Sequence, residues 1–355
     1  MKKKDVFNIF FAASPLHLIC LNELRHKENI SKFQLILLLH KDHKHGINQM
    51  FITLDKFKMK NYIILWIPKI NLIRFFFEFS LIIKLKIKYF KQKKRFVLID
   101  FRNIFMHSLR RFFKNDDFIL IDDGFHTYVA HNNYMSKNIF LPNLMYKSLN
   151  GCLAKTLYYG KSYNRLKNTP LKLFTMYADE INNKHAIMNE LSFLKKKINK
   201  KELQFSDDKV YFAGTKLVER GVLTFAQEFE IINKLNSYWN KKGKEMFYVG
   251  KRSSTKKKLE RFEENGIKTL NFEQPLEIVL SEMVDIPSHI CTFGSTLQKS
   301  LKLLFEDKIR FYFIDLIEYF SSSNEQDLPI LSKGVDKNIS NYSINSNNIE
   351  TINLQ

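Results

Sequence analysis

The stretch FILIDDGFHTY, residues 118–128, decides the fold class of this chain. Its first four residues are a short, continuous apolar run, which is typical of a strand buried on both faces. Asp122 and Asp123 follow at once, and Gly124 permits a tight turn after them. Like charges beside a core are unfavourable unless solvent, a partner or a chemical role keeps them there. The end of this strand is therefore a candidate site, and an Asp-Asp-Gly turn that only caps the strand is the plainer alternative.

The same kind of apolar run recurs through the first half of the chain, and helical patterns that start at Pro15 and near Ile70 separate several of the runs. The other runs are VFNIFFAAS (6–14), FQLILLLH (33–40), NYIILWIP (61–68) and RFVLIDF (95–101). Continuous apolar strands that alternate with helices predict a parallel sheet covered on both faces. The first half is therefore expected to be an α/β domain.

A lysine-rich segment, SFLKKKINKK (192–201), interrupts the pattern, and the alternation then restarts. The later strand-like runs are VYFAGT (210–215), EMFYVG (245–250), IKTLNF (267–272) and HICTFG (289–294). We predict an N-terminal domain over residues 1–200, a second domain over 201–330, and a polar tail over 331–355. The tail, rich in Asn and Ser, is expected to contribute little or no core.

Composition bounds the class of protein. The chain has 355 residues, 45% of them hydrophobic and 14% aromatic, and is long enough for two globular domains. Cys20, Cys152 and Cys291 lie far apart without the spacing of metal ligands, as is typical of a reducing cytoplasm. The net charge of +21 favours anionic lipid, phosphorylated substrates or nucleic acid as partners. No zinc-finger, RNP-type or helix-turn-helix signature supports nucleic acid, so we expect none to bind.

Two segments raise the question of a membrane. The N-terminal MKKKDVFNIFFAA (1–13) is similar to a signal peptide, but Asp5 and Asn8 interrupt it and no small-residue cleavage site follows. We expect it to enter the first strand. The segment NLIRFFFEFSLIIKLKIKYFK (71–91) is interrupted by charges, so no charge-free stretch reaches spanning length. It is either a core helix with snorkelling lysines or a basic helix that contacts an anionic membrane surface.

Basic residues follow a predicted strand of the second domain in YVGKRSSTKKK (248–258). The stretch lacks the glycine spacing of a Walker motif, so we reject a phosphate loop of that type. Lys251 and Arg252 nevertheless stand between a strand end and a helix start, where they form a candidate grip on a phosphate. A solvated basic surface is the alternative.

The stretch FGSTLQKSL (293–301) opens a helix directly after a predicted strand. Gly294 is followed by Ser295 and Thr296, which offer two hydroxyls and unpaired backbone N–H groups to an anion. An ordinary helix N-cap explains the same residues. The histidine-rich HKDHKHG (40–46) matches no known metal-ligand spacing and contains no cysteine, so we interpret it as a polar surface loop and predict no metal site.

Taken in order, these elements resemble the bacterial sialyltransferases of glycosyltransferase family 52, whose relatives are the capsular polysialyltransferases. The resemblance covers about residues 6–315. The motifs that carry it are a strand leading into SPLH (14–17), the Asp-Asp-Gly strand end, VYFAGTKLVERG (210–221), YVGKR (248–252), PLEIVLSE (275–282) and FGSTLQKSL (293–301). It implies an α/β fold of GT-B type, with two Rossmann-like doubly wound domains facing a central cleft. The first domain would bind the acceptor and the second the nucleotide sugar.

The resemblance also implies a metal-independent, inverting transfer from CMP-sialic acid, with no cofactor. Asp123, assisted by Asp122, would remove the proton of the acceptor hydroxyl, and Gly124 would let the substrate approach. The donor would be bound by residues of the second domain: Lys251, Arg252, Gly294, Ser295 and Thr296 at the phosphate, and Glu277 at the ribose or base.

Two departures from the family's pattern concern the donor. Lys251 and Arg252 stand where the family usually carries a His-Pro or His-Arg pair, and lysine is a poorer acid than histidine near neutrality. Leu217 stands where some members carry an acid, for which Glu219 is the nearest substitute. A transferase of the same fold for a neutral sugar, such as a glucosyl donor, therefore remains an alternative.

The expected role is a cytoplasmic glycosyltransferase, peripheral on the inner face of the cytoplasmic membrane, that acts in O-antigen, lipooligosaccharide or capsule biosynthesis. Its expected partners are a nucleotide sugar, a lipid-linked oligosaccharide acceptor ending in a galactose-type sugar, and the anionic membrane surface; a homodimer is left open. A non-enzymatic basic protein that binds membrane or nucleic acid is the alternative from another class. The acids at 122 and 123 argue against it, since a polyanion binder gains nothing from them.

Overall fold

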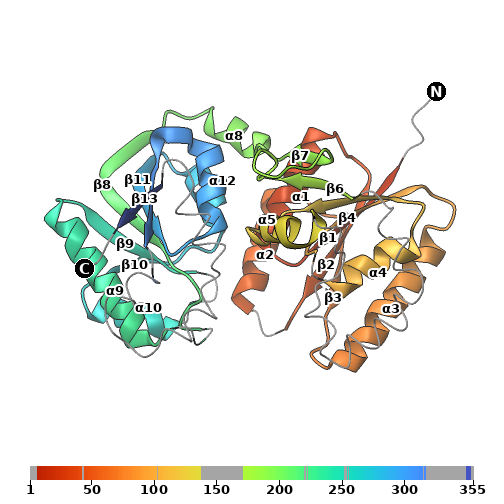
Figure 1. Ribbon diagram of the computed structural model, residues 1–355, viewed down its shortest axis with the longest axis horizontal. Coiled ribbons are helices and arrows are strands. Elements are labelled where there is room, and N and C mark those ends of the chain that lie inside the picture. Colours follow the sequence, from red (N-terminus) through yellow and green to blue (C-terminus); the bar gives the residue numbers. More distant parts are fainter. Residues whose placement is uncertain are drawn as a thin grey trace. The chain divides into compact units, whose positions relative to one another are not determined.

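The computed structural model describes residues 6–41, 44–101, 103–136, 171–219, 221, 223–251, 254, 256–314, 316 and 349–352. They belong to two compact units, Met1–Phe193 and Leu194–Gln355. Figure 1 shows that each unit is a sheet covered by helices. The division falls inside the lysine-rich segment that interrupts the sequence pattern. The two parallel sheets confirm the predicted fold class, an α/β fold of GT-B type with two Rossmann-like units in one chain.

The described part of the first unit contains a seven-stranded, wholly parallel sheet in the order β3-β2-β1-β4-β5-β6-β7. Its strands are β1 (Phe7–Ala12), β2 (Phe33–Leu39), β3 (Tyr62–Trp66), β4 (Lys94–Leu98), β5 (Asp117–Ile121), β6 (Lys172–Thr175) and β7 (Ala186–Met188). Its helices are α1 (Pro15–Lys27), α2 (Lys44–Lys56), α3 (Asn71–Lys88), α4 (Ile104–Phe112) and the short α5 (His126–Ala130), which a π-helical turn, His131–Met135, continues. Helix α8 (Ser192–Ile198) follows at the boundary.

Helices cover both faces of this sheet, as the continuous apolar strands predict. Helix α1 packs beside α2, and α3 packs beside α4; Figure 1 shows the two pairs on opposite sides of the sheet. The central strands are consequently buried along almost their whole length, with Phe10, Phe11, Phe96 and Phe118 among the residues that water does not reach. Burial of such large apolar side chains is the main source of stability for the unit.

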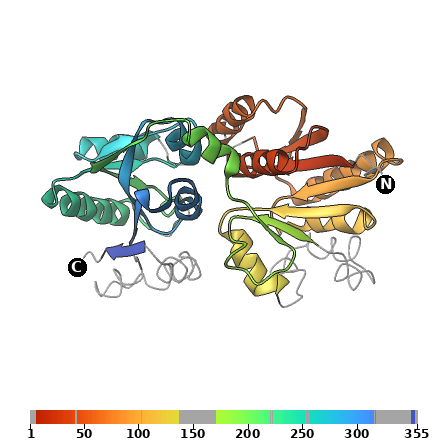
Figure 2. The ribbon, with the colours of Figure 1, turned by 90° about the horizontal axis from the view of Figure 1, so that it is seen from above.

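The described part of the second unit contains a six-stranded parallel sheet in the order β10-β9-β8-β11-β12-β13. Its strands are β8 (Gln204–Ala213), β9 (Glu245–Val249), β10 (Lys268–Leu270), β11 (Asp285–Thr292), β12 (Arg310–Ile314) and β13 (Ile349–Ile352). Its helices are α9 (Phe225–Lys241), α10 (Lys256–Glu264), α11 (Leu276–Glu282) and α12 (Thr296–Phe305), with a 3-10 turn at Glu306–Lys308. Figure 2 shows the same elements from above.

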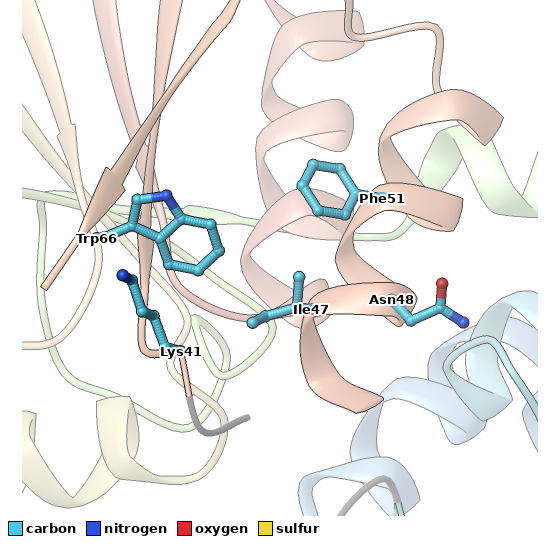
Figure 3. A pocket seen from close by; sticks show the side chains of 5 residues that line it. All are labelled: Lys41, Ile47, Asn48, Phe51 and Trp66. Atoms are coloured by element: carbon cyan, nitrogen blue, oxygen red, sulfur yellow. The ribbon is translucent and has the colours of Figure 1, made fainter. Parts of the chain in front are cut away.

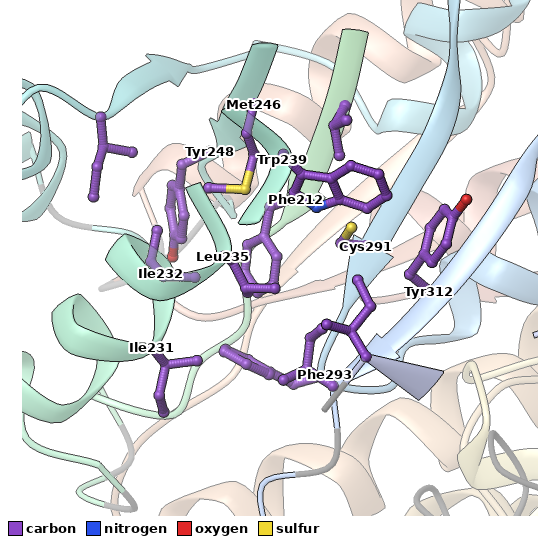
Figure 4. Close-up of a cluster of buried hydrophobic side chains, with 14 of the residues drawn as sticks. Phe212, Ile231, Ile232, Leu235, Trp239, Met246, Tyr248, Cys291, Phe293 and Tyr312 are labelled. Carbon is purple, nitrogen blue, oxygen red and sulfur yellow. The ribbon is translucent and has the colours of Figure 1, made fainter. Parts of the chain in front are cut away.

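Trp239 is at the centre of the second unit's core. Its side chain is almost fully buried, and its ring lies edge-on to that of Tyr312 with the centroids 4.9 Å apart. The surrounding side chains come from helices α9 and α10 and from strands β8, β9, β11, β12 and β13, and Figure 4 shows several of them. The rings of Phe212 and Tyr248 stack within this cluster, with their centroids 5.7 Å apart. Each unit therefore has its own apolar core.

The end of the chain differs from the expectation of a tail without core. Residues 349–352 form β13, which extends the second sheet beside β12, and Ile352 is buried in the same core as Trp239. Four residues with two isoleucines give too short a pattern to recognise among the surrounding Asn and Ser. Residues 317–348 lie outside the described residues. Strands β6, β7 and β12 are likewise absent from the sequence-based assignment.

The N-terminal run enters a strand as expected, since β1 begins at Phe7. No helix within the described residues is both long and apolar enough to cross a membrane. Helix α3 has apolar side chains on two sides. One side is buried against its unit, and the large apolar side chains of the other side are exposed.

Candidate active site

Both sheets contain a point at which the strand order reverses. In the first sheet the chain moves outward from β1 in one direction to β2 and β3, and in the other to β4 and β5. In the second sheet β8 and β11 flank the corresponding point. Ligands of open parallel sheets bind beyond the carboxyl ends of the strands at such switch points. Candidate site residues are therefore expected after β1 and β5 in the first unit and, separately, after β8 and β11 in the second.

His17 and Asp123 meet beside the switch point of the first sheet. His17 lies in the first turn of α1, after β1, and Asp123 follows β5. The distance from His17 Nε2 to Asp123 Oδ1 is 3.1 Å, although 106 residues separate the two in sequence. The histidine side chain is only 4% exposed, whereas that of Asp123 is 27% exposed. Asp123 is thus the member of the pair that a ligand can reach.

The local backbone fixes the role of each ring nitrogen of His17. The backbone N–H of Ala13 donates a hydrogen bond to Nδ1, at 3.1 Å. Nδ1 therefore carries no proton, and in the neutral imidazole Nε2 carries it and donates to Asp123. Ser14 caps α1 through a bond from the backbone N–H of His17, and Pro15 occupies the first turn. The sequence Ser-Pro-Leu-His thus builds the helix start that holds the ring.

Asp122 is in a different environment from its neighbour. Its carboxylate is fully buried and accepts hydrogen bonds from the Thr175 hydroxyl, at 2.5 Å, and from the backbone N–H of Met176, at 2.7 Å. These bonds join the end of β5 to the end of β6. Two adjacent acids are tolerated because one is bound inside the unit while the other faces outward. The geometry gives Asp122 a structural task beside the assisting role expected of it.

Gly124 occupies the turn that the sequence predicts for it. Its φ of +68° lies in the left-handed region, which a residue with a side chain adopts only at a cost. The hydroxyl of Thr127 accepts a hydrogen bond from the backbone N–H of Asp123, at 2.9 Å. The turn and this bond fix the backbone on both sides of the Asp123 carboxylate.

At the switch point of the second sheet, Gly294 follows β11 with a φ of +95°. Ser295 is the N-cap of α12 and accepts a bond from the backbone N–H of Leu297, at 3.3 Å, and Thr296 is the first helical residue. The predicted helix start is therefore present, with the Ser295 hydroxyl already used as a cap.

Three buried polar groups at this switch point have no hydrogen-bond partner among the described residues. They are the hydroxyl of Thr215, which follows β8, the hydroxyl of Thr292, the last residue of β11, and Nε2 of Gln298, in the first turn of α12. All three residues are more than nine-tenths buried. Buried polar groups are nearly always paired with protein or water, so these three groups at the end of the sheet are available to a water or a ligand. None of the three residues stands out in the sequence, because an isolated Thr or Gln carries no pattern.

Lys251 follows β9 after one residue, Gly250, and β9 lies one strand away from the switch point. Its backbone N–H donates to the hydroxyl of Ser254, at 3.1 Å, and its carbonyl accepts from the backbone N–H of Ser254, at 2.7 Å. This local turn fixes the backbone from which the lysine side chain extends. Arg252, the other half of the predicted phosphate grip, lies outside the described residues.

The predicted donor residue Glu277 and the possible second acid Glu219 have partners inside the second unit. Glu277, in α11, accepts a hydrogen bond from the hydroxyl of Ser300, at 3.0 Å. Glu219 lies 3.6 Å from the amine of Lys258, which also lies 2.6 Å from the fully buried carboxylate of Glu228. Burial raises the pKa of Glu228, and the adjacent Lys258 opposes that shift. Glu219 therefore belongs to a buried ion cluster, and its role as a second acid stays a prediction.

A shallow pocket lies at the carboxyl ends of β2 and β3 in the first unit, with a volume of about 620 Å³. Its lining residues are Lys41, Ile47, Asn48, Phe51 and Trp66. Figure 3 shows the Trp66 ring from β3 and the Phe51 ring from α2 on two sides of this space. Flat apolar walls with a few polar groups are typical of small-molecule sites. The pocket opens at the same edge of the sheet as Asp123.

No cluster of three or more histidine, cysteine or acidic residues able to hold a metal exists among the described residues. Asp42 and His43, from the histidine-rich loop, lie outside them. Cys20 and Cys291 are buried and are not part of a disulfide among the described residues, and Cys152 lies outside those residues.

No family model matches the chain, and no curated protein matches it. Solved structures do. A putative UDP-N-acetylglucosamine 2-epimerase from Listeria monocytogenes aligns with a TM-score of 0.51 and 8% identity, covering 98% of this chain and 99% of that one. The GT-B domain of a sialyltransferase from Photobacterium damselae aligns with a TM-score of 0.48 and 11% identity, covering 98% and 100%. At 8% identity, the likeness to the epimerase supports the fold alone.

Proposed function

We propose that the protein is a glycosyltransferase in which Asp123 is the general base and a nucleotide sugar is the donor. The observation that carries the proposal is the His17–Asp123 pair: a partly exposed carboxylate, held by a buried histidine, beside the switch point of a doubly wound sheet. A base must be oriented and must reach its substrate, and this carboxylate meets both conditions.

Asp123, and not His17, is the base in this proposal. Both ring nitrogens of His17 are engaged, Nδ1 by the Ala13 backbone and Nε2 by Asp123. The ring is also almost fully buried, so a bound substrate cannot reach it. A hydrogen bond donated to a carboxylate favours its charged form, which is the form that accepts a proton. His17 is therefore a positioning residue.

In the proposed reaction an acceptor hydroxyl attacks the anomeric carbon of the donor sugar. The new bond joins the acceptor oxygen to that carbon, the bond from the carbon to the phosphate oxygen breaks, and the nucleotide leaves with the bonding electrons. Asp123 takes the proton of the acceptor hydroxyl. A single displacement of this kind inverts the anomeric configuration.

The donor is assigned to the second unit. Thr215 and Gln298 offer buried polar groups without partners, and the start of α12 presents backbone N–H groups at a helix N-terminus. The resemblance to family 52 adds CMP-sialic acid as the donor, with Lys251 and Arg252 supplying positive charge in place of a metal ion. Glu277 is assigned to the nucleotide by resemblance only.

The acceptor is assigned to the first unit. The pocket beside Trp66 and Phe51 lies at the same sheet edge as Asp123, and its flat rings suit the apolar face of a sugar. The family resemblance suggests a galactose-terminated, lipid-linked oligosaccharide of a bacterial surface polysaccharide, formed on the cytoplasmic side of the membrane.

The test is a donor screen with the purified full chain and a galactose-terminated acceptor. CMP-sialic acid, UDP-glucose and UDP-N-acetylglucosamine are each supplied with and without EDTA. We expect transfer from CMP-sialic acid that EDTA does not abolish. Transfer from a UDP-sugar alone would correct the donor but keep the base, whereas conversion of UDP-N-acetylglucosamine without an acceptor would contradict transfer altogether.

Two variants test the pair. Asp123→Ala should lower kcat by about 10²–10⁴-fold with little change in donor affinity, because a base acts on the barrier. His17→Phe should lower kcat less and leave the donor KM nearly unchanged, because the carboxylate stays in place but loses the hydrogen bond that orients it. Near wild-type turnover of Asp123→Ala would remove it from the mechanism.

A further inference from the structure

Exposed apolar side chains are concentrated in one short segment of the molecule. Among the described residues, every exposed large apolar side chain except Val284 lies between positions 62 and 90. The residues are Tyr62, Ile63, Trp66, Ile70, Leu72, Ile73, Phe76, Phe79, Ile83, Ile87 and Phe90. Single exposed apolar residues are ordinary on protein surfaces, but a concentration of this kind marks an interaction surface.

Five of these residues form one stripe along α3. Leu72, Phe76, Phe79, Ile83 and Ile87 recur at intervals of three or four residues, which places them on a single side of the helix. Phe76 is 61% exposed and Ile87 is 74% exposed. The opposite side is buried in its own unit, so α3 is apolar on two sides and only one of them is used in folding.

The charge of α3 identifies the partner of the exposed side. Its one acid, Glu78, is mostly buried and is paired with Arg74 at 2.7 Å. The remaining charges of the helix are Lys84, Lys86 and Lys88, all exposed and all near its C-terminal end. A helix with an exposed apolar stripe bordered by lysines is attracted to the interface of an anionic lipid bilayer, where negatively charged headgroups cover an apolar interior.

We propose that the exposed side of α3 inserts into the boundary region of an anionic lipid bilayer, with its lysines among the headgroups. The helix lies parallel to the bilayer plane and does not cross it. Its apolar stripe supplies attachment that salt does not screen, and Lys84, Lys86 and Lys88 supply the preference for anionic lipid. This proposal is independent of the proposed enzymatic function.

The test uses the purified full chain and vesicles of either pure phosphatidylcholine or phosphatidylcholine with about one-third phosphatidylglycerol. We expect binding to the anionic vesicles that weakens but persists when salt is raised. The double variant Phe76→Ser, Ile87→Ser should lower the partition coefficient by about tenfold for each residue, the size expected for one large apolar side chain left in water. Val284→Ser, which changes an exposed apolar residue of the other unit, is the matched control and should bind like the wild type.

A second pair of changes separates charge from apolar contact. Lys84→Gln, Lys88→Gln should lower binding to anionic vesicles several-fold and leave the weak binding to neutral vesicles unchanged. Circular dichroism checks that all variants fold, as exposed positions allow. Equal vesicle binding by wild type and the double serine variant would overturn the proposal. A second outcome would also overturn it: sedimentation velocity without lipid shows a dimer for the wild type and a monomer for the serine variant, and the variant binds vesicles like the wild type. The stripe would then bind a second copy of the chain.

Discussion

At the scale of single residues, the two neighbouring acids show how one sequence feature serves two purposes. Asp122 is bound by Thr175 and the Met176 backbone inside the first unit, while Asp123 is partly exposed and is held by the buried His17. The turn at Gly124 makes the separation of the two carboxylates possible. A change at position 122 is therefore expected to affect stability first, and one at 123 to affect chemistry first.

His107 gives the first unit a sensitivity to acid. Its Nε2–H donates to the Phe101 carbonyl at 2.5 Å, and burial, together with the nearby Arg110 charge, lowers its pKa from 6.5 to about 3. Between those two values the unfolded chain binds a proton that the folded chain does not. This contribution to stability is complete above pH 6.5 and is lost as the pH falls toward 3.

We expect the free energy of unfolding of the wild type to fall by up to about 1.4 kcal/mol per pH unit from this group below pH 6.5. His107→Gln keeps a donor for the Phe101 carbonyl but cannot titrate, so its stability should fall less between pH 7 and pH 5. Urea unfolding at the two pH values measures the difference. Parallel losses in wild type and variant would show that His107 is not responsible.

At the scale of helices and strands, the apolar runs were sufficient to locate most strands of the two sheets. Strands that are buried on both faces are nearly continuous in apolar residues. Strands β1, β2 and β9 begin and end within two residues of their predicted bounds. Strand β13 was missed because its burial comes from pairing with β12 and not from its own composition.

The site was predictable only in part, for a related reason. Asp123 and Gly124 follow an apolar run and stand out in the sequence. The contact with His17 depends on how β1 and β5 are placed in the sheet, which no local pattern encodes. Thr215 and Gln298 become notable only because folding buries them without a partner.

Two variants distinguish a capping role of Ser295, at the start of α12, from a role in donor binding. Ser295→Ala should cost about 1 kcal/mol of stability through the lost cap, and Thr224→Ala, which removes the capping box of α9, should cost about the same. If the α12 start also binds the donor, only Ser295→Ala should raise the donor KM. Chemical unfolding and steady-state kinetics measure the two effects. Equal donor KM values in both variants would leave Ser295 a cap and nothing more.

At the scale of the whole molecule, the two units carry one tryptophan each. Trp66 is 41% exposed at the edge of the first sheet, and Trp239 is 1% exposed in the core of the second unit. The variant Trp66→Phe therefore leaves Trp239 as a fluorescence probe of the second unit alone. Proteins of two units often depart from two-state unfolding, so a probe specific to one unit is needed to locate a ligand.

With this variant we expect CMP to raise the unfolding midpoint reported by Trp239. A ligand at one hundred times its dissociation constant stabilises the unit that binds it by about 2.7 kcal/mol, provided that the unfolded chain does not bind. Removing positive charge in Lys251→Ala should reduce the shift. A larger shift with UDP than with CMP would point to a UDP-sugar as donor. No shift with either nucleotide would show that the second unit does not bind the donor. The assignment of the buried Thr215 and Gln298 to the donor would then be wrong.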